Sequence, residues 1–414
     1  MTGPGPNGAA GRIPQSRHET VTASDKRPTT RLVHSGSHPK RHKGVINTPV
    51  YRASTVLFPT VDALKQGVKT RFDSVFYGRH GTPTTMALEE AAADLEGGYR
   101  SVAVPSGVSA IMVSLLAFLK SGDHLLMTDT AYSPSRDICR DFLANYGIKT
   151  DFYDPMIGAG VKELIRPETK AVFTESPGSL TFEVQDIPAI ADAAHVHGIK
   201  VIMDNTWSAG FFFKPFKYGV DVSIQAATKY LAGHADVMAG LVTAANEEDW
   251  KKLKTTSAYL GMCLGGDDAY LTSRGIRTLD VRLERHQATG LKLAEWFKAQ
   301  PEVEKVLHPA FPECPGHDTW RRDFTGASGL FGVSFKGIPE TIIPVMLDNM
   351  EIFGMGFSWG GFESLMTLTS PPPVRSAVPW AATGPLLRIH AGQEDPDDLI
   401  DDLEAGFKRL RAAA

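Results

Sequence analysis

The chain has few cysteines and no paired ones. Cys139, Cys263 and Cys314 are far apart, and none belongs to a Cys-x-x-Cys motif. An odd number of cysteines at such spacing argues against a disulfide framework and against a zinc site built on thiolates. We therefore expect a protein of a reducing compartment and predict the cytoplasm.

Long apolar runs and a strong charge imbalance are also missing. The longest strongly apolar run, 110–119, is shorter than the ~20 residues that a helix needs to cross a bilayer. The N-terminus has no basic segment followed by an apolar one, as a signal peptide would have. The formal net charge of −4 gives no electrostatic reason for binding nucleic acid or an anionic membrane, so we expect neither partner. No P-loop pattern occurs, which disfavours a nucleoside triphosphate site.

Apolar residues make up 42% of the 414 positions, enough for a sizeable core in two or three domains. Residues 1–44 differ in kind, because they are rich in Gly, Pro, Ser and Thr. Between Arg12 and Lys43 they carry eight basic residues against Glu19 and Asp25, a local net charge of +6 (8 − 2). This composition is typical of a flexible leader, or of an arm that orders on a partner subunit. A nucleic-acid-binding tail is the alternative, although no aromatic residue is interleaved with these charges.

Between residues 85 and 230 the pattern alternates between helix and strand. We expect helices over 86–96, 108–119 and 186–197, and strands over 101–104, 124–127, 170–175 and 200–204. Such alternation predicts a mostly parallel sheet with helices on both faces. Ligands of these sheets bind beyond the carboxyl ends of the strands. Five chemically suitable residues fall at that place, namely Gly107, Tyr132, Ser176, Asp204 and Lys229.

Two of these residues suit one particular cofactor. Asp204 ends the apolar strand pattern 201–203, and Lys229 follows the pattern 222–227 and Thr228. A lysine can hold an aldehyde as a Schiff base while a carboxylate partners a pyridinium nitrogen, which is what pyridoxal 5'-phosphate (PLP) requires. Burial would lower the pKa of Lys229 and make it a nucleophile and a base. The alternative interpretations are that Lys229 is a surface lysine and that Asp204 caps a turn.

Further residues suit the cofactor phosphate. Gly107 and Val108 open a helix whose free N–H groups can bind a phosphate, and the Thr228 hydroxyl can reach the same group. Tyr77 and Arg79 lie in a glycine-spaced loop that could also bind it. The alternative interpretations are that Gly107 and Val108 begin an ordinary helix and that Tyr77 and Arg79 belong to a solvated loop.

Two residues suit the cofactor ring and the substrate. Tyr132 follows a strand, where its ring could stack on a flat ligand or join the core. Arg388 lies between apolar residues of a strand and so needs an anion. That anion is either the α-carboxylate of an amino acid or the acid of an internal salt bridge.

The pattern changes after about Arg274 and predicts a smaller domain. We expect a polar helix over 278–298 and strands around Val306 and over 329–335 and 386–390. The segment 352–358 is strand-like. A closing helix over 395–411 begins with acidic and ends with basic residues, in the order that the helix dipole favours.

From about Thr30 onward the chain resembles the PLP-dependent Cys/Met-metabolism (trans-sulfuration) family. The matching passages are Phe76-Tyr77-Gly78-Arg79, Leu95-Glu96-Gly97-Gly98, Thr130-Ala131-Tyr132, Glu175-Ser176-Pro177-Gly178-Ser179, Asp204-Asn205-Thr206-Trp207, Ser223 to Tyr230, Thr272-Ser273-Arg274-Gly275, Ser358-Trp359-Gly360-Gly361 and Leu387-Arg388-Ile389-His390. The resemblance implies an α/β fold of PLP-dependent transferase type I (aspartate-aminotransferase-like). In that fold a large domain with a mostly parallel sheet carries a smaller C-terminal α/β domain.

The resemblance also implies domain bounds and an assembly. The expected parts are a flexible leader (1–44), an N-terminal arm that contributes to the neighbouring active site (45–84), a PLP-binding domain (85–274) and a C-terminal domain (275–414). The family's usual assembly is a homotetramer built from two catalytic dimers. A single subunit would then hold an incomplete site.

Residue roles follow from the same resemblance. Lys229 would bind PLP and shuttle protons, with Tyr132 and Tyr77 as further catalytic residues. Asp204 would hold the ring nitrogen, and Tyr132 would stack on the ring. The phosphate would be bound by Gly107, Val108 and Thr228 of one subunit and by Tyr77 and Arg79 of its neighbour. The substrate would contact Arg388, Ser358, Trp359 and Tyr77, and no metal is expected.

Three departures bear on the reaction. Many relatives that act at the γ-carbon carry Asn-Pro where this chain has Ser179-Leu180, and serine where it has Ala226. Both differences favour the β-lyase branch. The expected reaction is therefore β-elimination of an amino-acid thioether, L-cystathionine, to homocysteine, pyruvate and ammonia in methionine biosynthesis. Phe357 stands where β-lyases often have tyrosine, so a hydroxyl contact to the distal part of the substrate is in doubt.

Other activities remain open. The chain could be a broad cysteine-S-conjugate or cystine β-lyase, or a γ-lyase or γ-synthase of the same family. A non-enzymatic regulator with this fold is disfavoured, because Lys229, Asp204 and Arg388 are all present.

Overall fold

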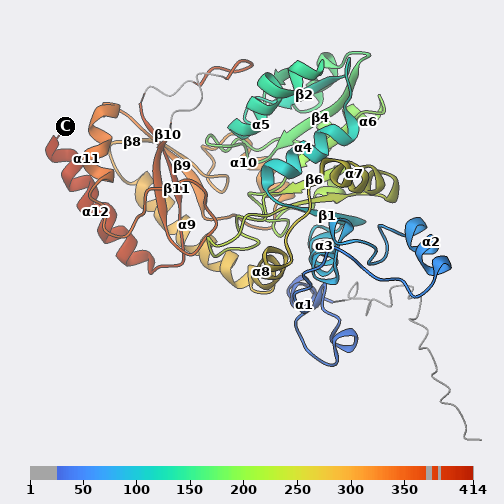
Figure 1. Ribbon diagram of the computed structural model, residues 1–414. Coiled ribbons are helices and arrows are strands. Elements are labelled where there is room, and N and C mark those ends of the chain that lie inside the picture. Colours follow the sequence, from blue (N-terminus) through green and yellow to red (C-terminus); the bar gives the residue numbers. More distant parts are fainter. Residues whose placement is uncertain (1–25, 370–374, 381–383, 414) are drawn as a thin grey trace, which may run out of the picture.

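The structure is a computed structural model that describes residues 26–369, 375–380 and 384–413. It has two lobes, each formed around one sheet (Figure 1). The leader expected over 1–44 is described only from Lys26 onward, and residues 1–25 lie outside the described residues. In its described part, helix α1 (Pro28–His34) buries Leu32 in the same cluster as Leu88 and Ala91. This stretch is therefore helical and packed.

Seven strands form the sheet of the large lobe. They are β1 (Arg100–Val104), β2 (His124–Thr128), β3 (Lys149–Tyr153), β4 (Thr169–Glu175), β5 (Lys200–Asp204), β6 (Val222–Gln225) and β7 (Gly240–Ala244). Their order is β1-β7-β6-β5-β4-β2-β3. The pairs from β3 to β6 are parallel, whereas β7 is antiparallel to both β6 and β1. The predicted mostly parallel sheet is confirmed.

Helices cover both faces of this sheet because its strands are apolar on both sides. The helices that accompany the large lobe are α3 (Pro83–Glu96), α4 (Gly107–Phe118), α5 (Ser133–Asp137), α6 (Ile187–His195), α7 (Glu247–Leu260) and α8 (Gly266–Ile276). Along β5, Val201 and Met203 join the core cluster that contains residues of α3 and α6. Ile202, between them, joins the cluster that contains residues of α4 and α7. Because side chains alternate along a strand, β5 contributes to two separate cores.

The small lobe contains a four-stranded antiparallel sheet. Its strands are β8 (Val303–Leu307), β9 (Leu330–Phe335), β10 (Leu365–Thr369) and β11 (Leu386–His390), in the order β10-β11-β9-β8. Its helices are α9 (Leu279–Lys298), α10 (His317–Asp323), α11 (Ile343–Leu347) and α12 (Pro396–Ala413). Phe297 of α9 and Phe407 of α12 are fully buried in the core of this lobe.

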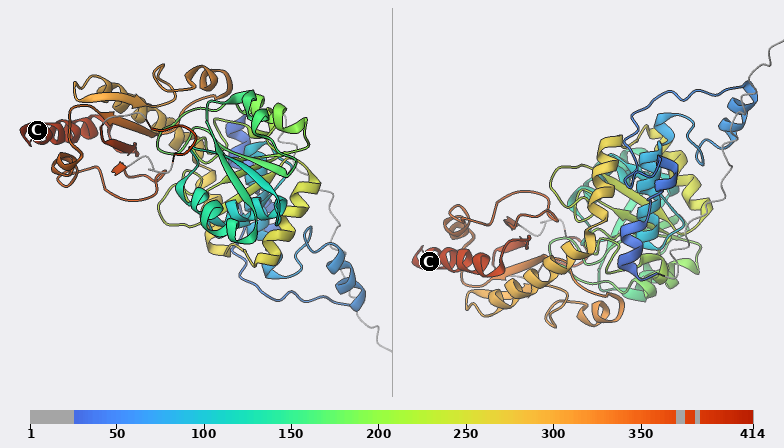
Figure 2. Two further views of the ribbon diagram at one scale, coloured as in Figure 1. Left: turned by 90° about the horizontal axis from the view of Figure 1, so that it is seen from above. Right: turned by 90° about the horizontal axis from the view of Figure 1, so that it is seen from below.

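Helix α2 (Val61–Lys69) and the extended chain around it project away from both lobes (Figures 1 and 2). This segment carries large apolar side chains that face solvent, with Leu57 90% exposed and Ile46 71% exposed. Within the described residues, no helix is both long and apolar enough to span a membrane.

Three details differ from the sequence expectations. Segment 352–358 is not a strand, and its sheet contact is a single bridge between Gly354 and Leu365. The strand of this region is β10, farther along the chain. β3 and β7 were not predicted, because the pattern Lys149–Tyr153 is largely polar and because the stretch before 240–244 gives no strong turn signal that separates this strand from Lys229.

Candidate active site

Strands β4, β5 and β6 bring their carboxyl ends together, as the sequence pattern predicted. Glu175 of β4 pairs with Asp204 of β5, which in turn pairs with Ile224 of β6. The loop after β6 leads directly to Lys229. Asp204 and Lys229 are therefore neighbours because their strands are adjacent and parallel.

Asp204 is a buried carboxylate with one oxygen already fixed. Its Oδ1 accepts hydrogen bonds from the Thr206 backbone N–H (3.0 Å) and hydroxyl (2.6 Å). Among the described residues, no hydrogen bond reaches Oδ2. Burial raises the pKa of Asp204, and the Thr206 bonds oppose that rise. The carboxylate is thus oriented and has one oxygen available for a cationic partner.

The Lys229 amine is largely removed from water. Burial, followed by the positive charge of Arg388, lowers its pKa to about 8, while Asp204 acts in the opposite direction. Its Nζ donates a hydrogen bond to Ser358 Oγ (2.6 Å) and lies 5.4 Å from the centroid of the Trp359 ring. A larger fraction of this amine is neutral near neutral pH than for an exposed lysine, which suits a nucleophile and base.

Ser358 and Trp359 come from the small lobe on a strained turn. Ser358 has a φ of 79°, in the left-handed region that side chains other than glycine rarely adopt. Gly360 also has a positive φ, and a Cβ there would lie 2.7 Å from the Tyr230 nitrogen. The Gly360 N–H donates to His390 Nε2 (3.1 Å). The turn therefore packs directly against the backbone that carries Lys229.

Arg388 lies on β11 and points toward the same turn. Its Nη2 donates to the carbonyls of Gly356 (3.3 Å) and Ser358 (3.2 Å). Its pKa is lowered by burial. Within the described part of the chain no salt bridge involves Arg388, so the internal ion pair considered from the sequence is absent. A half-buried guanidinium without a carboxylate partner is suited to bind an anionic ligand.

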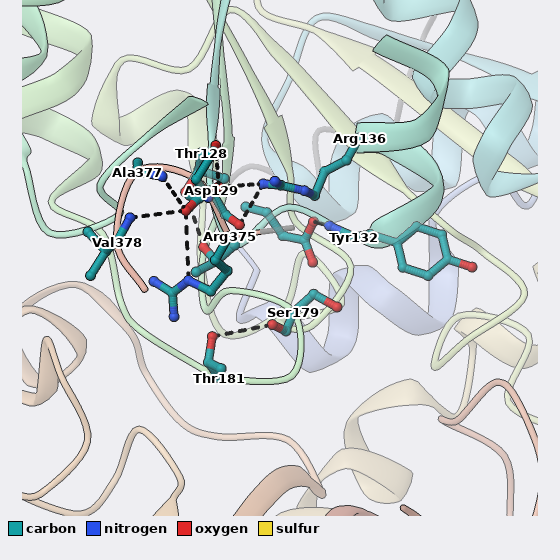
Figure 3. A network of polar contacts seen from close by, with 12 residues as sticks. Thr128, Asp129, Tyr132, Arg136, Ser179, Thr181, Arg375, Ala377 and Val378 are labelled. Atoms are coloured by element: carbon teal, nitrogen blue, oxygen red, sulfur yellow. Dashed lines mark hydrogen bonds and ion pairs between the residues drawn. The ribbon is translucent and has the colours of Figure 1, made fainter. Parts of the chain in front are cut away.

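Tyr132 lies beside this group, at the start of α5. Its backbone N–H donates to Glu175 Oε2 (2.7 Å), and Figure 3 shows its ring extending away from the polar cluster around Asp129. The ring is 44% exposed, so it is not a core residue. A flat ligand above Asp204 would have this ring available for stacking.

The first turn of α4 meets the loop that carries Lys229. A Cβ at Gly107 would lie 2.7 Å from the Ala226 Cβ, so a glycine is needed for this close contact. Ser106 caps the helix by accepting from the Ser109 N–H (3.1 Å). The N–H groups of Gly107 and Val108 have no partner inside the helix. The Thr228 hydroxyl is already bonded to the backbone of Ala239.

Tyr77 and Arg79 are not brought to the Lys229 group within one chain. Arg79 donates to the Ala258 carbonyl, and the Tyr77 ring lies 6.4 Å from the ring centroid of His80. In the described part of the chain, no hydrogen bond, ion pair or ring contact joins either residue to Lys229. The single subunit therefore assembles the other predicted site residues without these two.

Comparison with known proteins identifies the family. The model of the Cys/Met metabolism PLP-dependent enzyme family matches residues 29–408. This chain belongs to that family.

Named proteins of this family align with the chain over nearly its whole length. It is 45% identical to the cystathionine beta-lyase MetC of Escherichia coli (strain K12) over 94% of this chain and 100% of that protein. It is 46% identical to a cystathionine beta-lyase of Salmonella typhimurium, with the same coverage. Among solved structures, cystathionine gamma synthase from Xanthomonas oryzae, in complex with aminoacrylate and cysteine, superposes with a TM-score of 0.86 at 28% identity, covering 94% of this chain and 99% of that one.

The residues present fit the cofactor of this PLP-dependent family. Lys229 provides a partly neutral amine, and Asp204 has one oriented oxygen without a partner. The α4 N-terminus provides free N–H groups where glycine permits a close approach. These three features match the aldehyde, ring nitrogen and phosphate of PLP.

Two residues near the site were not among the predicted ones. Glu175 is partly buried beside Asp204 and Tyr132, and loss of solvation together with the Asp204 charge raises its pKa well above the usual range. Its position at the end of β4 is equivalent to that of Asp204 on β5, so the strand-end rule could have found it. Thr206 fixes Asp204 and also accepts from the Ala226 N–H (2.9 Å). In the sequence, the only feature that pointed to Thr206 was its place in Asp204-Asn205-Thr206.

Proposed function

We propose that this chain is a carbon–sulfur lyase that splits L-cystathionine by β-elimination into homocysteine, pyruvate and ammonia, a step of methionine biosynthesis. The observation that carries the proposal is the meeting of a buried amine, Lys229, with an anion-binding guanidinium, Arg388, across the Ser358 turn. The named cystathionine beta-lyases that align with the chain over nearly all of its length support the choice of substrate.

In this proposal six residues of one subunit would hold the cofactor. Lys229 would bind its aldehyde, Asp204 would partner its ring nitrogen, and Tyr132 would stack on its ring. Gly107 and Val108 would donate to its phosphate, and Thr228 would do so if its hydroxyl left Ala239. Bound PLP supplies the electron sink that makes cleavage next to the substrate nitrogen possible.

Arg388 binds the α-carboxylate of the substrate, while Ser358 and Trp359 line its pocket. Lys229 would take the substrate α-proton at Nζ, and its pKa, lowered to about 8, provides the neutral amine that a base requires. Once protonated, the Lys229 amine can donate that proton to the leaving group. Ser358 orients the amine through its 2.6 Å hydrogen bond. Trp359 covers the amine and excludes water.

Tyr77 and Arg79 act in the site of a neighbouring subunit, where Tyr77 contacts cofactor and substrate and Arg79 the phosphate. The projecting segment around α2, with its exposed Leu57 and Ile46, supports this proposal, because so much exposed apolar surface favours contact with a second copy. The proposed assembly is a cytoplasmic homotetramer of two catalytic dimers. Residues 45–84 form the exchanged arm, 85–274 the PLP-binding domain and 275–414 the C-terminal domain.

A broad cysteine-S-conjugate or cystine β-lyase is the second candidate. The side chain of Phe357, directly before Ser358, is 96% exposed and offers an apolar ring instead of a hydroxyl group. Such a surface accepts apolar sulfur substituents as readily as polar ones.

One experiment separates these activities. The purified holoenzyme is incubated with cystathionine, cystine and methionine, and the 2-oxo acids are quantified. Pyruvate from cystathionine, at the highest kcat/KM of the three substrates, is the expected result. A preference for cystine would select the second candidate. Formation of 2-oxobutyrate would instead indicate γ-elimination and contradict β-lyase action.

A further inference from the structure

A second cluster of buried charges lies beside the site without contacting Lys229. It consists of Asp129, Arg136, Glu183 and Arg375, and each side chain is less than a tenth exposed (Figure 3). Charges buried this deeply destabilise a fold unless they are paired. Nothing in the proposed chemistry uses these four residues, so their retention in the interior calls for another explanation.

Asp129 is the centre of the cluster. Its Oδ1 accepts from Arg136 Nη1 (2.7 Å) and from the backbone N–H of Ser376 (3.1 Å). Its Oδ2 accepts from the N–H groups of Ala377 (2.9 Å) and Val378 (3.2 Å). Three consecutive N–H groups therefore bind one carboxylate, an arrangement typical of anion-binding backbone segments.

These N–H groups belong to the small lobe. Residues 375–378, which we name the strap, lie between β10 and β11 in the chain, whereas Asp129 directly follows β2 of the large lobe. Arg375 of the strap adds a second link, because its Nη1 donates to Glu183 Oε1 (2.9 Å) and its Nε lies 3.9 Å from Asp129 Oδ2. The strap is thus held to the large lobe by both its backbone and its side chain.

On the large-lobe side, the cluster continues into the turn that carries Tyr132. The Thr130 carbonyl, next to Asp129, accepts from the Ser179 N–H (2.8 Å). The Tyr132 N–H donates to Glu175. The 129–132 turn is therefore fixed at both ends, and Asp129 is the end that the strap contacts.

On the small-lobe side, the strap leads into β11, which carries Arg388. β10 precedes the strap and pairs with β11 in a register that sets Thr367 opposite Arg388. Because the strap belongs to the connection between these two strands, we infer that its attachment to Asp129 sets where the strand pair lies relative to the Tyr132 turn.

We propose that Asp129, Glu183 and Arg375 form an interlobe latch that sets the spacing between Tyr132 and Arg388. These are positioning residues, because none of them contacts the Lys229 group. The inference rests on the proposed roles of Tyr132 as the ring-stacking residue and Arg388 as the carboxylate-binding residue. The latch acts on any ligand that uses both contacts at once, namely an α-amino acid bound at the cofactor.

The test compares ligands with and without a carboxylate on the holoenzyme. Asp129→Asn and Arg375→Gln should raise the KM for cystathionine and the Kd for L-alanine, measured from the cofactor absorbance, by about tenfold, since small misplacements of binding groups are costly. Hydroxylamine attacks the cofactor but has no carboxylate, so its rate should stay within about twofold of wild type. Arg375→Lys should recover part of the lost affinity, because it keeps the charge opposite Glu183.

A matched control is Arg166→Gln, which removes an exposed arginine–carboxylate pair with Asp151 inside the large lobe. It should leave all three measurements unchanged. Glu183→Gln is the milder variant should Arg375→Gln fail to fold, because it leaves Asp129 and its backbone contacts intact.

Two outcomes would overturn the latch. One is a KM and Kd within about twofold of wild type in folded Asp129→Asn and Glu183→Gln. The other is a hydroxylamine rate that falls as much as L-alanine affinity, since that would indicate a general disturbance of the site. A wild-type protein that releases no pyruvate would contradict the proposed function alone, because the L-alanine titration would still test the latch.

Discussion

The two lobes build their halves of the site in different ways. In the large lobe, Asp204 and Glu175 lie side by side because they end adjacent parallel strands, and Lys229 follows the next strand. In the small lobe, Ser358 and Arg388 come from a strained turn and from the middle of an antiparallel strand. The first arrangement follows from regular structure, whereas the second depends on a network of individual contacts.

This difference has a functional consequence. Groups at strand ends are held by whole cores, since β5 alone contributes to two clusters. The Ser358 turn is held by a few hydrogen bonds, including the one from Gly360 to His390. Changes to Lys229 and Asp204 in the large lobe should therefore affect the chemistry itself, while changes to Arg388 in the small lobe should affect mainly the binding of substrate.

The strongest test of this contrast is Lys229→Ala. We expect pyruvate release from cystathionine to fall about 10⁴-fold, since both the cofactor bond and the base are lost. The far-UV circular dichroism spectrum should be unchanged. Lys252→Ala on α7, which removes a surface pair with Glu248 (2.8 Å) and a contact with the Phe118 ring (5.8 Å), is the control and should retain full activity. Near-normal turnover by the Lys229 variant would refute the assignment.

A smaller effect is expected on the other lobe. Arg388→Gln should raise the KM for cystathionine by about 10- to 100-fold, with a lesser change in kcat, because it removes charge-assisted hydrogen bonds to the carboxylate. The KM of Arg388→Lys should lie between those of the wild type and Arg388→Gln, because lysine keeps the charge but not the planar guanidinium. If kcat falls while KM stays constant, the proposed division of labour between the lobes is wrong.

The pH dependence of PLP incorporation into the apoprotein should show that Arg388 of the small lobe acts on Lys229 of the large lobe. The rate of PLP incorporation, followed by visible absorbance, should rise with pH and level off above about 8, the pKa of Lys229, because the neutral amine is the nucleophile. The positive charge of Arg388 lowers this pKa, so Arg388→Gln should move the midpoint to higher pH. A midpoint that stays fixed, or moves down, would contradict this coupling.

The smallest effects should come from Ser358. Ser358→Ala loses the 2.6 Å hydrogen bond to Lys229 and should lower kcat/KM by about tenfold or less, the value of one hydrogen bond to a charged group. Ser358→Gly loses the same bond but relieves the positive φ, a strain of about 1 kcal/mol. Its thermal midpoint should therefore exceed that of Ser358→Ala. The reverse order would show that the turn is not strained.

Much of the large lobe could be predicted from the sequence. The apolar patterns that became β4, β5 and β6 end at Glu175, Asp204 and Gln225, within a residue or two of where they were expected. Most positions of these strands are buried, and each strand carries apolar residues between turn residues. The strand-end rule groups Asp204, Lys229 and Tyr132 from the sequence alone.

The small lobe was harder to predict. Segment 352–358 contains apolar residues and no charge after Glu351, and so resembles a strand, yet Phe357 faces solvent and Ser358 has a positive φ. Its backbone is instead fixed by Arg388 from β11 and by Asp402 from α12. Such long-range contacts have no local signature in the chain.

The sequence by itself determined the alternation of helices and strands, the placing of Asp204 and Lys229 at neighbouring strand ends, and the family to which the chain belongs. These follow from local patterns of burial and from short motifs. Only the tertiary structure decided that Arg388 has no carboxylate partner among the described residues, that Ser358 bonds the Lys229 amine, and that the strap binds Asp129. The reason is physical, because a contact between residues more than a hundred positions apart depends on how the two lobes pack and not on the residues around either partner.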